Sequence, residues 1–155
     1  MENNSFTRRM QHFYPGKEIF EIFYNSVEGK QCANVVQYKE QVILDALDKP
    51  KELLIKDKTI SIRFDYPLTH EVSFEYNKKD GFTRLDLFRC IYEGYIKIYE
   101  TEKDETGDPG AIEGLYNRKT SKGKFGIWGH YIDELLIEGV VYDSKDKVVE
   151  LIIGS

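Results

Sequence analysis

The chain has 155 residues and a formal net charge of −5, from 22 Lys and Arg against 27 Asp and Glu. This length suits one domain that can bury a core of its own, so neither disulfides nor a structural metal ion is required. The chain holds 11 Tyr and 9 Phe but only 3 His and 2 Cys, which argues against a cysteine scaffold and a multi-histidine metal centre. The negative charge argues against a domain whose whole surface binds nucleic acid.

Cysteine usage and hydropathy predict a soluble intracellular protein. Cys32 and Cys90 form no CxxC pair, and we expect both to be reduced thiols, partly buried. The N-terminal residues lack the apolar segment of a signal peptide, and no stretch has the roughly 18 apolar residues of a membrane span.

The first third of the chain gives mixed signals. Residues 1–16 are polar and end in Pro-Gly, and we interpret them as a flexible N-terminal arm before a single domain at 17–155. Lys17–Val27 fits either a helix or a short strand, and helix is slightly favoured. Ala33–Leu47 carries apolar residues near helical spacing, with Pro50 as a stop, and predicts a helix.

Two segments predict β-hairpins. Apolar and polar residues alternate in Lys58–Tyr66 and in His70–Tyr76, which indicates antiparallel strands with one buried face. Glu134–Tyr142 and Lys147–Ile153 are rich in β-branched residues and flank the turn-forming residues 143–146.

The clearest prediction is a long amphipathic helix from Arg84 to about Lys103. Thr83 is placed as its N-cap, with Asp86 three residues later in a near capping box. One stripe of this helix is apolar and aromatic: Leu85, Phe88, Ile91, Tyr92, Tyr95, Ile98 and Tyr99. The elements together predict an α+β fold, in which an antiparallel sheet from two β-hairpins packs against this helix and one or two N-terminal helices.

Residues 106–131 have six glycines, one proline and no sustained period, and a segment of this kind in a compact domain is generally functional or mobile. Arg118, Lys119, Lys122 and Lys124 fall within seven residues with no acid among them. Such a run offers cations and free backbone amides to a phosphate, an acidic partner or a nucleic-acid backbone. A solvated basic loop is the alternative, and the P-loop order is absent.

The stretch GKFGIWGHYID, residues 123–133, follows at once. His130 with Asp133 or Glu134 could form an oriented general base, but no motif pairs it with a nucleophile. The alternative is structural, with glycine turns and Trp128 buried beneath the second hairpin. Tyr116 and Tyr131 lie on the same long segment and are further candidates for binding.

The remaining histidines and acids are candidates for metal ligands. His12, His70 and His130 lack ligand spacing, so we expect no metal site and no cofactor. The acids Glu102, Asp104, Glu105 and Asp108 do not follow an EF-hand order, and we expect them to form a solvated helix end.

Residues 82–155 resemble a group of uncharacterised small proteins of large DNA viruses of amoebae, including marseillevirus-like viruses. The most specific motifs are Tyr116-Asn117-Arg118, Gly126-Ile127-Trp128-Gly129-His130 and Leu136 with Glu138-Gly139. The resemblance implies a setting, namely host cytoplasm or virus factory, with packaging in the virion as a further option. It implies no catalytic residues and no mechanism.

We therefore expect a non-enzymatic interaction module that binds viral or host proteins and itself. Exposed sheet edges favour a homodimer, and abundant tyrosine suits interfaces. Two alternatives stay open: nucleic-acid or phosphate binding through the loop 118–124, with Arg8 and Arg9, and an enzyme that uses His130 and Asp133. The expected binding residues are Tyr116, Asn117, Arg118, Lys119, Lys122, Lys124, Trp128, His130 and Tyr131.

Overall fold

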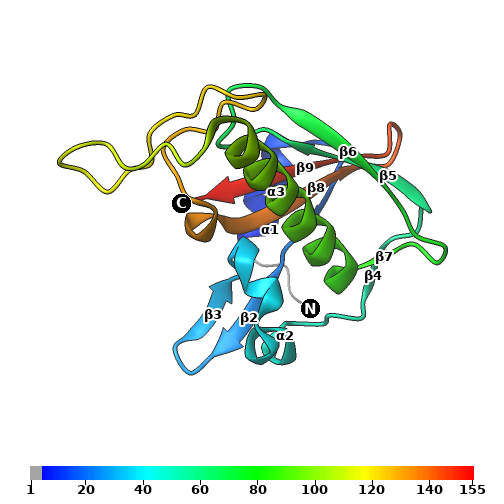
Figure 1. Ribbon diagram of the computed structural model, residues 1–155. Coiled ribbons are helices and arrows are strands. Elements are labelled where there is room, and N and C mark those ends of the chain that lie inside the picture. The colour runs from blue at the N-terminus through cyan, green and yellow to red at the C-terminus, as the bar shows by residue number, and fades with distance from the viewer. Residues whose placement is uncertain (1–4) are drawn as a thin grey trace.

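The computed structural model describes residues 5–155 and has an α+β architecture in which one long helix lies across a five-stranded sheet (Figure 1). The helix is α3 (Arg84–Thr106), and the strand order of the sheet is β1-β8-β9-β5-β6. These strands span Glu18–Phe20 (β1), Thr59–Phe64 (β5), Val72–Asn77 (β6), Leu136–Asp143 (β8) and Val148–Gly154 (β9). The predicted α+β class is confirmed.

Both predicted hairpins are present. β5 pairs with β6, and β8 pairs with β9, each in antiparallel register. The two hairpins meet through β5 and β9, which run parallel with Ile62 opposite Val149. A parallel pair needs a long crossover between its strands, and α3 with the loop after it forms part of that connection. The sheet is therefore mixed, whereas the sequence predicted an antiparallel one.

The helix α3 begins where the sequence predicted. The Thr83 hydroxyl accepts a hydrogen bond from the Asp86 amide at 3.1 Å, and the Asp86 carboxylate accepts one from the Thr83 amide at 2.9 Å. Together these bonds form the expected capping box. The apolar stripe packs on the sheet, where Tyr95 is fully buried and its hydroxyl donates to the Tyr66 carbonyl at 2.6 Å.

The N-terminal part of the chain differs from the predicted elements. Residues 5–13 of the expected arm form a helix, α1 (Ser5–Phe13), while residues 1–4 lie outside the described part of the chain. Lys17–Val27 holds strands instead of a helix: β1 and β2 (Phe23–Ser26), with β2 paired to β3 (Gly29–Cys32). The reason is tertiary: β1 pairs with β8 at the sheet edge and buries Ile19, which outweighs the local periodicity.

The predicted helix at Ala33–Leu47 is split in two. A 3-10 helix, η1 (Val35–Lys39), and a short α-helix, α2 (Gln41–Ala46), are separated at Glu40. Asn34 has an extended backbone and caps η1 through its side chain, so η1 begins at Val35 and not at Ala33 as predicted. A further small pair joins β4 (Leu53–Ile55) to β7 (Phe82–Thr83).

The helix α1 covers the sheet on the face opposite α3. Val140 and Tyr142 belong to the core beneath α3, and Gly139 and Val141 alternate with them along β8. A Cβ atom at Gly139 would lie 2.8 Å from the Phe6 ring of α1. Figure 1 shows the dark blue α1 behind the sheet and the green α3 in front.

The helix α3 packs tightly against the sheet at Gly94. A Cβ atom there would overlap the Phe64 ring, with Cε1 and Cε2 each 2.8 Å away. The Phe64 ring is itself fully buried and meets Tyr95 edge-on at 5.0 Å between centroids, so it has no room to move aside.

We predict that Gly94→Ala destabilises the protein. Overpacking costs about 1–3 kcal/mol, which exceeds the roughly 1 kcal/mol that alanine gains in helix propensity. Urea unfolding measures the change, with Glu93→Ala, on the exposed side of the same turn, as the control. A Gly94→Ala variant as stable as the Glu93→Ala variant would show that the helix does not press on Phe64.

Candidate functional site

The long loop after α3 is organised around one buried carboxylate. Glu102 has no exposed surface, and its carboxylate accepts a hydrogen bond from the Ser121 hydroxyl. It also accepts backbone N–H groups at 2.9–3.1 Å from Gly123, Phe125 and Gly126. The expectation of a solvated helix end is therefore wrong for Glu102.

The charge of Glu102 is maintained by these donors. Burial alone would raise the pKa of Glu102, but the Ser121 hydroxyl and the backbone amides of Phe125, Gly123 and Ile127 outweigh it and hold the pKa below the usual 4.5. Glu105, one helical turn later, accepts the Lys124 amide at 2.6 Å. The loop segment 121–127 thus wraps around the end of α3, and we call it the carboxylate-bound loop.

Glycine permits the close approach of this loop. Gly126 has a φ of +59°, and a Cβ atom there would lie 2.8 Å from Thr69. The Thr69 hydroxyl donates to the Gly126 carbonyl at 2.7 Å, which ties the carboxylate-bound loop to the turn after β5. Gly126 is therefore required both by its positive φ and by its close approach to Thr69.

The predicted phosphate-binding role of the loop loses part of its basis. In the basic run, the amides of Gly123 and Lys124 are not free as expected but are bound to the side chains of Glu102 and Glu105. The amides of Arg118, Lys119 and Ser121 donate to backbone carbonyls. Arg118 is only 4% exposed and donates to the Ile127 carbonyl at 2.9 Å. Lys119, Lys122 and Lys124 are exposed, and their binding of a nucleic acid stays a prediction.

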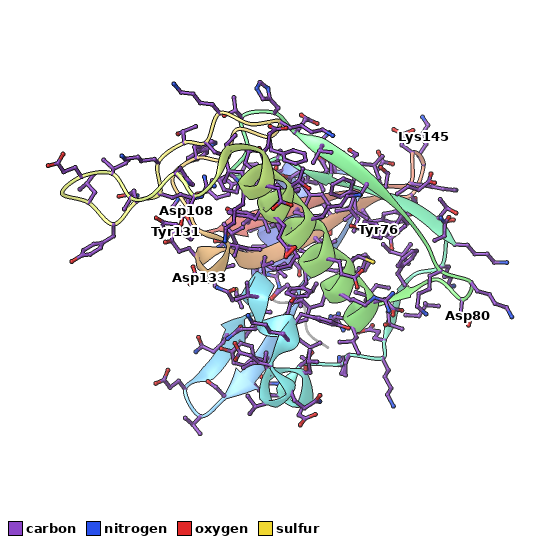
Figure 2. All side chains as sticks on the ribbon, in the orientation of Figure 1. Tyr76, Asp80, Asp108, Tyr131, Asp133 and Lys145 are labelled. Atoms are coloured by element: carbon purple, nitrogen blue, oxygen red, sulfur yellow. The ribbon has the colours of Figure 1, made fainter. Side chains whose placement is uncertain are left out.

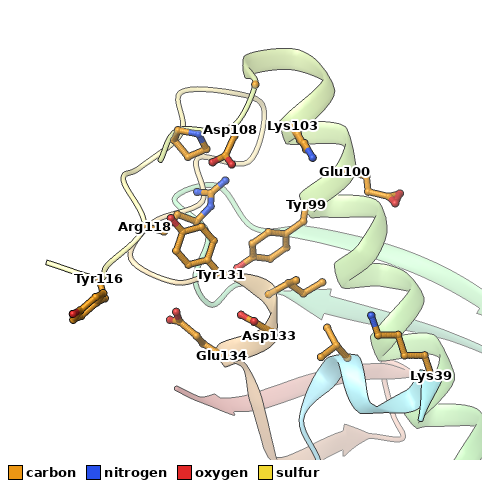
Figure 3. A pocket seen from close by; sticks show the side chains of 14 residues that line it. Lys39, Tyr99, Glu100, Lys103, Asp108, Tyr116, Arg118, Tyr131, Asp133 and Glu134 are labelled. Carbon is orange, nitrogen blue, oxygen red and sulfur yellow. The ribbon is translucent and has the colours of Figure 1, made fainter. Parts of the chain in front are cut away.

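Arg118 also borders a pocket of about 660 Å³ between α3, η1, the loop and a second 3-10 helix, η2 (Ile132–Glu134) (Figure 3). Its lining is amphipathic, with aromatic rings and charges of both signs. The aromatic and basic lining residues are Tyr99, Tyr116, Tyr131, Lys39, Lys103 and Arg118. The acidic ones are Glu100, Asp108, Asp133 and Glu134.

The arrangement of the lining limits which groups are free to bind. The Arg118 guanidinium lies 5.6 Å above the Tyr99 ring, so it is already held by a cation–π contact. The Tyr99 hydroxyl donates to the His130 carbonyl at 3.0 Å, and burial raises its pKa, so it remains protonated. Tyr131, Asp133 and Asp108 all line this pocket, at the end of the molecule where α3 stops and opposite the turns of Asp80 and Lys145 (Figure 2).

Beside the pocket, residues 107–118 project from the body of the protein, and we call them the projecting loop (yellow in Figure 1). Its apolar side chains face solvent: Tyr116 is 96% exposed, Leu115 56% and Ile112 40%. The tip is nevertheless ordered by backbone hydrogen bonds from Ile112 to the Asn117 carbonyl at 2.8 Å and from Leu115 to the Ile112 carbonyl at 2.9 Å. Tyr116, whose ring was expected to take part in binding, is the most exposed of these residues.

His130 is oriented by Glu134 and not by Asp133. Its Nδ1 lies 2.9 Å from the Glu134 carboxylate, and its Nε2 lies 3.2 Å from the Ser155 hydroxyl. The sequence offered both acids as partners of His130, and the geometry selects Glu134. Sequence reasoning missed Ser155, which is 25 residues away in the chain. Pairing of β8 with β9 returns the chain to this point, and no local motif signals it.

Trp128 is not buried beneath the second hairpin, as the structural alternative expected. It is exposed, and its ring meets Tyr66 edge-on at 5.2 Å between centroids. Phe125 and Ile127, on either side of Gly126, are buried and belong to the core instead. Trp128, Tyr66 and His130 together form an aromatic group at the surface, with Tyr66 and His130 5.7 Å apart.

Within residues 5–155, no three His, Cys, Asp or Glu side chains are arranged to hold a metal ion. No helix in the same range is long and apolar enough to cross a bilayer. Cys90 is buried as expected, while Cys32 is exposed, and both are free thiols.

We predict that Glu102→Gln destabilises the protein by about 2–3 kcal/mol, because the amide group cannot accept as many hydrogen bonds and places N–H donors against the backbone donors of the loop. Chemical unfolding measures this change. Glu100→Gln is the matched control, since Glu100 lies on the same helix and is exposed. Equal stabilities of the two variants would contradict the role given to Glu102.

The lowered pKa of Glu102 also predicts a pH dependence. A carboxyl with a lower pKa in the folded than in the unfolded state contributes stability above the unfolded value, and this contribution is lost as the pH falls through the folded value. The wild type and the Glu102→Gln variant should therefore differ less in their free energy of unfolding as the pH drops below 4.5. Unfolding curves at a series of pH values test this, and a difference that stays constant down to the acid transition would contradict it.

Comparison with known proteins does not identify the chain: no family model, no curated protein and no solved structure matches it. The resemblance to proteins of amoebal viruses stays a prediction. We therefore infer function from the pocket, the projecting loop and the contacts of His130 with Glu134 and Ser155.

Proposed function

We propose that this protein is an interaction module that binds other proteins through the projecting loop and also binds a second copy of itself. The observation that carries the proposal is the solvent exposure of Tyr116, Leu115 and Ile112 on a loop that is held in shape by its own hydrogen bonds. Large apolar side chains that gather at a protruding tip mark interaction surfaces.

The order of the loop matters to its affinity for a partner. A segment that is already shaped loses less conformational entropy on binding than a disordered one. Tyrosine combines a large apolar ring with a polar hydroxyl, so it can remain in water and still anchor an interface. Tyr116 also lines the pocket, so a partner that covers the loop tip can reach Tyr131 and Lys103.

The sheet edges support self-association. Among the described residues, β6 pairs with β5 alone, so one side of its backbone is open to another strand.

The setting we propose is the host cytoplasm or virus factory of an infected amoeba, with the virion as a further location, on the strength of the sequence resemblance. Binding of nucleic acid by the exposed lysines is a weaker candidate, because Arg118 and the loop amides are engaged inside the protein.

We predict that a photo-crosslinking phenylalanine at position 116 gives discrete protein adducts. Position 27 is the matched control, because Val27 is 105% exposed at the turn of another hairpin and is also apolar. The adducts should be resolved by mass spectrometry, first with purified protein and then in extract of infected or expressing cells. A dimer adduct in purified protein shows self-association, and adducts found only in extract show another partner.

A second substitution distinguishes specific crosslinks at position 116 from those formed by non-specific encounters. Leu115→Asp should remove the adducts at position 116 without changing stability, since surface substitutions usually change it by less than about 0.5 kcal/mol. The same adducts from positions 116 and 27, or adducts that persist with Leu115→Asp, would contradict the proposal. A mass of one chain in light scattering, together with no dimer adduct, would remove self-association.

A further inference from the structure

His130 stands between a carboxylate and a hydroxyl. Its Nδ1 is 2.9 Å from the Glu134 carboxylate, and its Nε2 is 3.2 Å from the Ser155 hydroxyl. The carboxylate comes from η2 and the hydroxyl from the residue directly after β9, so two separate elements converge on one imidazole. This is the order of groups by which a serine nucleophile is activated.

Activation of Ser155 requires the proton of a neutral His130 to be on Nδ1, and the hydrogen bonds of the ring are consistent with this position. The Glu134 carboxylate can only accept, so a neutral His130 donates its Nδ1 proton to Glu134. The Nε2 lone pair then faces Ser155 and can accept the proton of the hydroxyl. The ring is further held by Tyr66 at 5.7 Å and by Trp128 at 5.9 Å between centroids.

The surroundings of Ser155 suit a small substrate with an aromatic part. Ser155 is exposed, so a reagent can reach its hydroxyl from solvent. The Tyr66 hydroxyl is 2.8 Å from the Ser155 oxygen and can donate to negative charge that develops on a substrate oxygen beside it. The exposed Trp128 ring, edge-on to Tyr66, offers an apolar surface next to the hydroxyl.

We propose that Ser155, His130 and Glu134 form a nucleophilic triad that hydrolyses small aryl esters. The Ser155 oxygen bonds to the ester carbonyl carbon while its proton passes to His130 Nε2. The bond from that carbon to the aryl oxygen breaks, and the leaving oxygen takes the proton from His130. Water then attacks the acyl-serine, its proton passes through His130 to the Ser155 oxygen, and the carboxylic acid is released.

Glu134 acts in this scheme as a positioning residue. It holds the imidazole in the tautomer that exposes the Nε2 lone pair, and it stabilises the imidazolium that forms during proton transfer. The proposal is independent of the projecting loop, because it uses none of the residues of that loop. It retains His130 from the sequence-based enzyme alternative and replaces Asp133 with Glu134.

The test uses an aryl fluorophosphonate, which reacts with activated serines, together with p-nitrophenyl acetate as substrate. Mass spectrometry of the intact and digested wild-type protein should find one adduct, on Ser155. Ser155→Ala should lose both the adduct and the hydrolysis, whereas Ser144→Ala, at an exposed turn serine, should retain both. His130→Ala should slow both reactions by about 100-fold or more, the usual contribution of a general base.

The Glu134→Gln variant tests whether Glu134 orients the His130 ring or only stabilises the fold. It should slow both reactions by at least about tenfold and alter the pH profile of hydrolysis, while its unfolding curve should match that of Asp133→Asn. No adduct on wild-type Ser155, an equal rate in Ser155→Ala, or an unchanged rate in His130→Ala would each overturn the proposal. A slowed Glu134→Gln variant with an unchanged pH profile would overturn the positioning role.

Discussion

The arrangement of the functional end of this protein depends on the burial of the Glu102 carboxylate. A buried charge is stable only when enough donors surround it, and here one hydroxyl and the amides of the carboxylate-bound loop supply them. The loop has no sustained hydrophobic period and too little regular structure to fold on its own. Glu102 therefore acts as the centre around which a glycine-rich segment takes one shape, and α3 determines where that centre lies.

The carboxylate-bound loop positions the segments on either side of it, namely the projecting loop and the residues around His130. On its N-terminal side Arg118 is bound to the Ile127 carbonyl, which fixes the base of the projecting loop and one wall of the pocket. On its C-terminal side the chain passes Trp128 and brings His130 to Ser155. The interaction surface and the proposed triad thus use the same support. In the basic run 118–124, by contrast, the Gly123 and Lys124 amides are bound to internal carboxylates and Arg118 is buried. The exposed lysine side chains remain for an external anion.

The sequence predicts most accurately those elements whose pattern is local. The capping box at Thr83 and the alternation in Lys58–Tyr66 contain their own evidence, and both are confirmed. The elements that were mispredicted depend on distant partners: β1 is a strand because it pairs with β8, and the parallel join of β5 to β9 has no sequence signal. The candidate site follows the same rule. His130 and its acid lie four residues apart and could be predicted, while Ser155 and the burial of Glu102 arise from contacts across 25 and about 20 residues.

Amide hydrogen exchange, measured by NMR, tests the central claim directly, because the claim concerns the loop amides themselves. In the wild type, the amides of Gly123, Phe125 and Gly126 should exchange slowly, and the amide of Gly114 on the projecting loop should exchange fast. In Glu102→Gln the three loop amides should lose more than about tenfold of their protection, the equivalent of 1.4 kcal/mol, while amides within α3 keep theirs. Equal protection of the loop amides in the two proteins would contradict the account, because the carboxylate would then not be what holds the loop.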